Sequence, residues 1–170
     1  MTHTGNVAAR NSIAQTPSDR ELVVSCVLNA PRELVFEAWT DARHIAQWWG
    51  PRGFTTTIHE MDVKPGGVWR FVMHGPDGVD YQNKIVYAEI VKPERLVYSH
   101  SSGEEGDPLQ FEVTVTFAAQ GDKTKLTLRL LFKSAEARDS VVKLGAIEGA
   151  QQTLDRLAEY LAEAHKGNES

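Results

Sequence analysis

His100 is the residue whose type and position are best suited to chemistry. It lies in the run 96–101 (Leu-Val-Tyr-Ser-His-Ser), which has the composition of a β-strand. Because side chains alternate along a strand, Leu96, Tyr98 and His100 share one face. If Leu96 points inward, the phenol and the imidazole do too, and a polar group inside an apolar pocket can orient a ligand or act as an acid or base. A histidine at the strand end that is satisfied by water is the competing interpretation.

Other reactive constellations do not occur in the sequence. The six histidines lie in different predicted elements, without the spacing of a zinc site. No nucleophile elbow, phosphate loop or dinucleotide fingerprint is found. Cys26 is the single cysteine, which excludes an internal disulfide, and its strand-like surroundings predict a small buried hydrophobe. The sequence therefore favours a container over a catalyst, with no catalytic residue, no metal and no cofactor.

Large aromatic side chains gather around tight connections. Trp48-Trp49-Gly50-Pro51 closes a short helical segment, because the proline forbids continuation of the helix. Downstream of a Pro-Gly-Gly turn, Trp69, Phe71 and Met73 occupy alternate positions and form one apolar wall of a strand. Such rings either fill a core or line a cavity. We favour core packing for any single ring and a cavity for the set.

Hydrophobic periodicity predicts the elements that position these residues. Residues 1–19 show no sustained period and are expected to form a flexible tail. A strand over residues 21–29 precedes two short helices, which begin near Pro31 and near Asp41. Short turn signals separate the later strands, so neighbours are expected to pair as antiparallel hairpins. Period-two patterns predict six further strands, over residues 54–61, 68–74, 81–91, 95–101, 109–118 and 123–132.

The C-terminal segment returns to a helical period. One apolar stripe is formed by Ile147, Ala150, Leu154, Leu157 and Leu161, which recur at intervals of three and four residues. The seven predicted strands have one apolar face that needs a cover, and the stripe needs burial. A strongly bent sheet wrapped around the long C-terminal helix satisfies both, in one domain over residues 20–165 with a frayed C-terminus over residues 166–170.

Five motifs, in this order, carry a resemblance to a known superfamily. They are residues 30–40 (Ala-Pro-Arg-Glu-Leu-Val-Phe-Glu-Ala-Trp-Thr), 48–51 (Trp-Trp-Gly-Pro), 65–71 (Pro-Gly-Gly-Val-Trp-Arg-Phe), 93–96 (Pro-Glu-Arg-Leu) and 149–161. The chain resembles the START-like, or SRPBCC, superfamily. Within it, the chain is most similar to the domain family named after the activator of the large heat-shock chaperone ATPase. The resemblance implies an α+β helix-grip fold: a strongly bent seven-stranded antiparallel sheet around the last helix, with two short helices after the first strand.

The last helix departs from the pattern of this family. The family usually has a tryptophan directly after the glycine, and this chain has Ala150. Either Trp48 or Trp69 fills the space, or the cavity is larger here. We expect a pocket of roughly 300–1,000 Å³ between sheet and helix. The residues expected to contact a ligand there are Trp48, Trp69, Phe71, Met73, Tyr98, His100, Phe111, Val113, Ala150 and Leu154.

Three functions remain open, and the first is preferred. The first is non-enzymatic binding of a small apolar or amphipathic ligand. The second, implied by the resemblance, is a co-chaperone-like interaction module of the stress response with a chaperone as partner. The third, known in the superfamily, is a cyclase or aromatase in which His100 or Tyr98 polarises a carbonyl. A homodimer is compatible with each.

Composition excludes other partners. The net charge of -5 and scattered Lys and Arg argue against nucleic-acid binding, which needs a basic face. No apolar run approaches the ~20 residues that span a bilayer, and no signal-peptide core is found at the N-terminus. We expect no membrane span and a cytoplasmic location.

Overall fold

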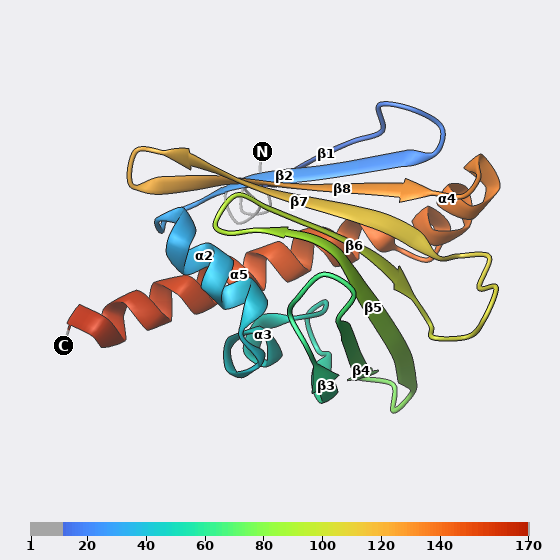
Figure 1. Ribbon diagram of the computed structural model, residues 1–170, viewed down its shortest axis with the longest axis horizontal. Coiled ribbons are helices and arrows are strands. Elements are labelled where there is room, and N and C mark those ends of the chain that lie inside the picture. The colour runs from blue at the N-terminus through green and yellow to red at the C-terminus, as the bar shows by residue number, and fades with distance from the viewer. Residues whose placement is uncertain (1–11, 170) are drawn as a thin grey trace, which may run out of the picture.

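The computed structural model describes residues 12–169, with side chains through Ala164. One antiparallel sheet bends around the long C-terminal helix α5 (Ala146–Glu169), and the helices α2 and α3 lie on the same side of the sheet as α5 (Figure 1). This confirms the expected α+β helix-grip arrangement. The apolar face of the sheet and the apolar stripe of α5 cover each other, which is why this packing is stable.

Within the described residues the sheet has eight strands, in the spatial order β1-β2-β8-β7-β6-β5-β4-β3. The strands are β1 (Ser12–Gln15), β2 (Glu21–Leu28), β3 (Thr55–Met61), β4 (Val68–His74), β5 (Asp80–Val91), β6 (Arg95–Ser101), β7 (Phe111–Gln120) and β8 (Lys123–Phe132). The helices α2 (Arg32–Thr40) and α3 (Ala42–Trp48) follow β2, and α4 (Ala135–Lys143) precedes α5. All neighbouring strands pair antiparallel.

The N-terminal strand β1 corrects the expected count of seven strands. It lies inside the segment 1–19 that was expected to be a tail, and it pairs with β2 from Ser12 opposite Cys26 to Gln15 opposite Val23. Its four residues contain one large apolar side chain, Ile13, which is 63% exposed. Local sequence therefore gives no signal for it, and the free edge of β2 creates the strand. Residues 1–11 lie outside the described residues.

The predicted C-terminal helix is two helices. A break at Leu144 and Gly145 separates α4 from α5, and Gly145 has φ +93°, a conformation that favours glycine. Ser134 begins α4 by accepting a hydrogen bond from the amide of Ala137 at 3.0 Å. The second helix continues to Glu169, beyond the expected end of the domain at residue 165. Ser170 lies outside the described residues.

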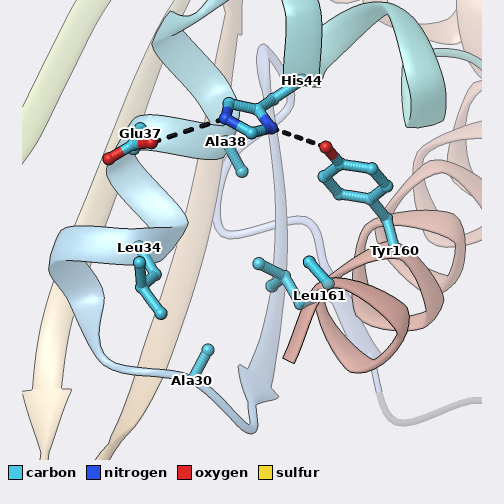
Figure 2. A pocket seen from close by; sticks show the side chains of 8 residues that line it. Ala30, Leu34, Glu37, Ala38, His44, Tyr160 and Leu161 are labelled. Atoms are coloured by element: carbon cyan, nitrogen blue, oxygen red, sulfur yellow. Dashed lines mark hydrogen bonds and ion pairs between the residues drawn. The ribbon is translucent and has the colours of Figure 1, made fainter. Parts of the chain in front are cut away.

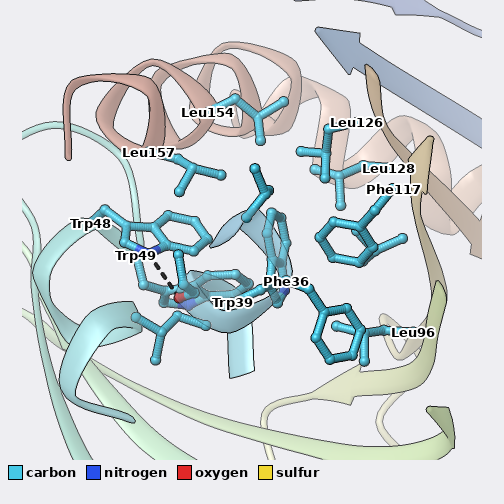
Figure 3. Close-up of a cluster of buried hydrophobic side chains, with 14 of the residues drawn as sticks. Phe36, Trp39, Trp48, Trp49, Leu96, Phe117, Leu126, Leu128, Leu154 and Leu157 are labelled. Atoms are coloured by element: carbon cyan, nitrogen blue, oxygen red, sulfur yellow. Dashed lines mark hydrogen bonds between the residues drawn. The ribbon is translucent and has the colours of Figure 1, made fainter. Parts of the chain in front are cut away.

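The core lies where α2, α3 and the second half of α5 meet the sheet. Trp39 and Trp48 pack edge to face with ring centroids 4.9 Å apart, and Trp48 donates its indole N–H to the carbonyl of Ala38 at 3.1 Å. Figure 3 shows Leu154 and Leu157 of α5 converging on these rings and on side chains of β7 and β8. Rings and leucines thus fill this half of the interface.

Candidate functional site

A cavity of about 360 Å³ separates the concave face of the sheet from the first two turns of α5. Its walls come from strands β4, β6, β7 and β8, from the loop after α3, and from the connection between α4 and α5. Its lining is mostly aliphatic and aromatic. This volume lies within the range of small-molecule sites, about 300–1,000 Å³.

The ten residues expected to contact a ligand divide into two groups. Six of them line this cavity: Met73, Tyr98, His100, Phe111, Val113 and Ala150. The other four are buried in the packed core instead: Trp48, Trp69, Phe71 and Leu154. The structure therefore brings most of the expected set together, and contact of these six with a ligand stays a prediction.

The positions of Trp48 and Trp49 explain why three aromatic residues expected on the cavity wall lie in the core instead. Trp49, which belongs to the aromatic set but was not among the residues expected to contact a ligand, lines the cavity. Its ring packs edge to face against Trp69 at 5.0 Å and against Phe71 at 6.0 Å between centroids. Strand alternation correctly put Trp69 and Phe71 on the inner face, but it could not show that a neighbouring ring covers them. Trp48 is the last residue of α3 and points into the core, while Trp49 is already extended.

Trp39 and the connection between α4 and α5 were not among the residues expected to contact a ligand. Trp39 lies on the apolar stripe of α2 and reaches the cavity from there, while Val141 and Leu144 close one end of it. Leu144 is 81% exposed, so it forms part of the rim. The one local signal for this connection is Gly145, because glycine disfavours a helix interior, and it does not show what the connection covers.

His100 is the polar side chain on the cavity wall that has a defined tautomer. Its Nε2 lies 2.8 Å from Oδ1 of Asn83. Because an amide oxygen only accepts, this hydrogen bond assigns the proton to Nε2, and Nδ1 becomes an acceptor. Burial lowers the pKa of His100 to about 4, so the ring is neutral at neutral pH. The imidazole therefore offers a ligand a neutral hydrogen-bond acceptor.

Tyr98 lies on the inner face of β6 together with His100, as expected from the alternation of side chains along a strand (strand parity). Only 3% of the residue is exposed, and its ring packs edge to face against Tyr87 with centroids 6.1 Å apart. Burial raises the pKa of the Tyr98 phenol above its usual range. The hydroxyl consequently stays protonated at neutral pH.

The helix side of the cavity is formed by small side chains. The first two turns of α5 contribute Ala146, Gly149, Ala150 and Thr153 to the wall. Neither Trp48 nor Trp69, the two neighbours expected to replace a missing indole, is part of the lining. The space beside Ala150 is therefore open.

Arg156 ties the loop after α3 to α5. Its Nη1 lies within hydrogen-bond distance of the carbonyl oxygens of Trp49 (3.2 Å), Gly50 (2.9 Å), Pro51 (3.1 Å) and Phe54 (3.2 Å). Its Nη2 donates to the carbonyl of Gln47 at 3.3 Å. A guanidinium suits this task because its donors form a rigid planar fork. Arg156 thus positions the loop that supplies Trp49, Gly50 and Pro51 to the cavity, and Gln152 and Glu159 of the same helix also bind this loop, at Arg52.

The described residues contain neither a metal-binding cluster nor a helix that could span a membrane. In that part of the chain, no group of three or more His, Cys, Asp or Glu side chains is arranged to hold a metal ion. No helix among the same residues has both the length and the apolar character of a membrane span.

Solved structures share this fold. A protein of Arthrobacter aurescens superposes with a TM-score of 0.83 at 22% identity, covering 89% of this chain and 91% of its own. A Mycobacterium smegmatis protein has a TM-score of 0.80 at 24% identity, with 88% and 95% covered. An AHSA1 protein from Silicibacter pomeroyi has a TM-score of 0.70 at 22% identity, with 85% and 99% covered.

The sequence comparisons give one match. Among curated proteins, no sequence matches this chain. The profile described as "Activator of Hsp90 ATPase homolog 1-like protein" matches residues 29–162, from the end of β2 almost to the end of the described side chains. The chain therefore belongs to the family of activator of Hsp90 ATPase homolog 1-like proteins, in the SRPBCC superfamily.

Proposed function

We propose that this protein binds a small apolar or amphipathic molecule in the cavity between the sheet and α5. The observation that carries the proposal is the cavity itself, about 360 Å³ of space with a mostly apolar wall. Protein interiors are normally close-packed, so an unfilled pocket of this size, with the exposed Leu144 on its rim, leaves apolar wall in contact with water, which has a cost in stability. Occupation by a ligand would remove that cost.

The polar groups of the wall indicate the amphipathic end of the ligand. Nδ1 of His100 is an acceptor because Asn83 holds the proton on Nε2. A ligand hydroxyl or N–H group that donates to Nδ1 would fix the orientation of an otherwise apolar molecule. Phe111 packs against His100, with centroids 5.0 Å apart, and belongs to the same wall. We therefore expect an apolar ring or chain that carries one donor group.

Binding fits the electrostatics of these residues better than general acid–base catalysis by His100 or Tyr98. A general acid or base works best when its pKa is near the working pH. The pKa of His100 is lowered to about 4, while burial raises the pKa of the Tyr98 phenol. Both groups thus keep one protonation state around neutral pH, which suits recognition rather than proton transfer.

The test is to fill the cavity from the helix. In Ala150→Trp the indole will occupy the open space, and we expect binding of the apolar dye 1-anilinonaphthalene-8-sulfonate to weaken by about tenfold or more, which corresponds to about 1.4 kcal/mol. Thermal stability will stay level or rise because a void is filled. The matched control is Ala162→Trp, the same substitution at an exposed position of α5.

Two outcomes would overturn the proposal. The first is dye binding that is unchanged in a folded Ala150→Trp variant. The second is a loss of about 1–3 kcal/mol in stability, which would mean that the position is already packed. Native mass spectrometry of the protein purified from its own host would then identify a bound molecule and count the subunits.

A co-chaperone role is the second candidate, and the description of the matching family favours it. Under this alternative the protein would stimulate the ATPase activity of a chaperone through its surface. Wild-type protein and Ala150→Trp would then stimulate equally, because the substitution lies inside the molecule. A ligand-dependent function predicts that the two proteins differ.

A further inference from the structure

A second pocket, of about 250 Å³, lies between α2, α3 and the second half of α5. It shares no lining residue with the cavity under the sheet. Figure 2 shows its two parts. The floor and sides are apolar, from Ala30, Leu34, Ala38, Leu161 and Ala164, and one wall carries the polar side chains of Glu37, His44 and Tyr160.

These polar side chains form a chain of three groups. Nδ1 of His44 lies 2.5 Å from the hydroxyl of Tyr160, and Nε2 lies 3.4 Å from Oε1 of Glu37 (Figure 2). With the ring proton on Nε2, which faces the carboxylate 3.4 Å away, Nδ1 of His44 accepts a hydrogen bond from the phenol of Tyr160. Burial raises the pKa of the Tyr160 phenol, which keeps that proton in place. The Tyr160 oxygen and the carboxylate of Glu37 then have lone pairs left to accept from a ligand.

The carboxylate of Glu37 gives the wall of this pocket a negative charge. Asp41 and Arg43 pair with each other at 2.8 Å, and Arg43 also attracts Glu37 electrostatically. Among the described side chains, none of the ion pairs joins Glu37 to a guanidinium or ammonium group, and its side chain is 59% exposed. A cationic group at this edge would meet the carboxylate of Glu37 and the phenol oxygen of Tyr160.

We propose that this pocket binds a small organic ammonium ion. Its N–H groups would donate to Tyr160 and Glu37, and its apolar body would lie against Leu34, Ala38 and Leu161. An anionic or neutral molecule of the same shape lacks the donors or the charge that the wall demands. The competing explanation is that the three polar groups only hold α3 against α5, and it predicts no ligand preference.

Three probes of matched shape test the proposal by calorimetry. We expect 2-phenylethylammonium to bind with a dissociation constant in the millimolar range, about 1 mM. We expect 2-phenylethanol and 3-phenylpropionate to bind at least about tenfold more weakly, which corresponds to about 1.4 kcal/mol. Similar binding of all three, or no binding of the ammonium, would overturn the proposal.

Variants locate the site. Glu37→Gln removes the charge and should weaken ammonium binding by about tenfold, while Glu33→Gln, at an exposed position of the same helix outside the pocket, should leave it unchanged. Ala164→Phe fills the pocket from an exposed position and leaves Glu37, His44 and Tyr160 unchanged. This variant should abolish ammonium binding. Ammonium binding that survives both substitutions contradicts the assignment. Ala150→Trp, which closes the other cavity, should have no effect, so this inference and the proposed function fail independently.

Discussion

The two halves of α5 face the same sheet, but one half borders a cavity and the other packs in the core. The first two turns contribute Ala146, Gly149, Ala150 and Thr153 to the wall of an open cavity. The following turns contribute Leu154, Leu157 and Leu161 to a packed core. The path of the backbone is a regular helix in both halves. Side-chain size on one face of one helix therefore decides whether a cavity or a packed core lies between that helix and the sheet.

Trp39 marks the boundary between the halves. It packs against Trp48 and Phe117 on the core side, with centroids 4.9 and 6.0 Å away. The same residue contributes to the cavity wall. The packed half thus forms a rigid aromatic surface on which the open half rests. If this division holds, substitutions in the core half will change stability first, and substitutions in the cavity half will change binding first.

The largest expected effect is in the packed half. Leu154 is 1% exposed and lies in the core rather than on the cavity wall, so Leu154→Ala will lower the free energy of unfolding by about 2–5 kcal/mol. Ala150→Gly, one turn earlier in the cavity half, will cost only the difference in helix propensity, about 1 kcal/mol. Chemical denaturation measures both. Equal losses of unfolding free energy in the two variants would show that the two halves of α5 are packed alike.

A smaller effect is expected where α5 holds the loop after α3. Arg156→Met keeps most of the side-chain length but removes the donors to five carbonyl oxygens. We expect a loss of about 1.5–3 kcal/mol, the range for hydrogen bonds to a charged group. Dye binding will weaken as well, because Trp49, Gly50 and Pro51 lose their support. Arg43→Met, at an exposed position, is the control. A stable Arg156→Met variant with normal dye binding would show that the contacts of Arg52 with Gln152 and Glu159 are enough to hold the loop.

The smallest effect is the pH dependence contributed by His100. Its pKa is lowered from 6.5 to about 4, so between these values the unfolded chain binds more protons than the folded one. The contribution of neutral His100 to the stability of the folded state is fully present above pH 6.5 and is lost as the pH falls toward 4. The loss will be about 1–3 kcal/mol, with water in the cavity reducing it. His100→Gln will remove this part of the pH dependence of unfolding, whereas exposed His59→Gln will not. Identical profiles for wild type and His100→Gln would contradict the burial of the ring.

Strand parity was the most reliable guide to the site. It placed Met73, Tyr98, His100, Phe111 and Val113 on one inner face, because alternation along a strand depends on backbone geometry alone. All five line the cavity. Parity also put Trp69 and Phe71 on that face, and there it could not distinguish a ring that borders a cavity from one covered by another ring. That difference depends on Trp49, which comes from a loop whose course periodicity does not describe.

Short or irregular segments were beyond the reach of periodicity. Strand β1 has four residues, and it forms because β2 offers an unpaired edge. The pocket of Glu37, His44 and Tyr160 joins residues more than 100 positions apart, so no local spacing could indicate it.

The sequence by itself determined the order and type of most elements, the apolar stripe of α5 and the family, because periodicity and turn chemistry are local. It also determined that position 150 carries a methyl group. Only the tertiary structure decided that this methyl group borders open space, that Trp49 rather than Trp48 lines it, and that Arg156 holds the loop in place. These are contacts between segments distant in the chain. Close packing allows only one side chain to occupy a given space, and local sequence does not show which one does.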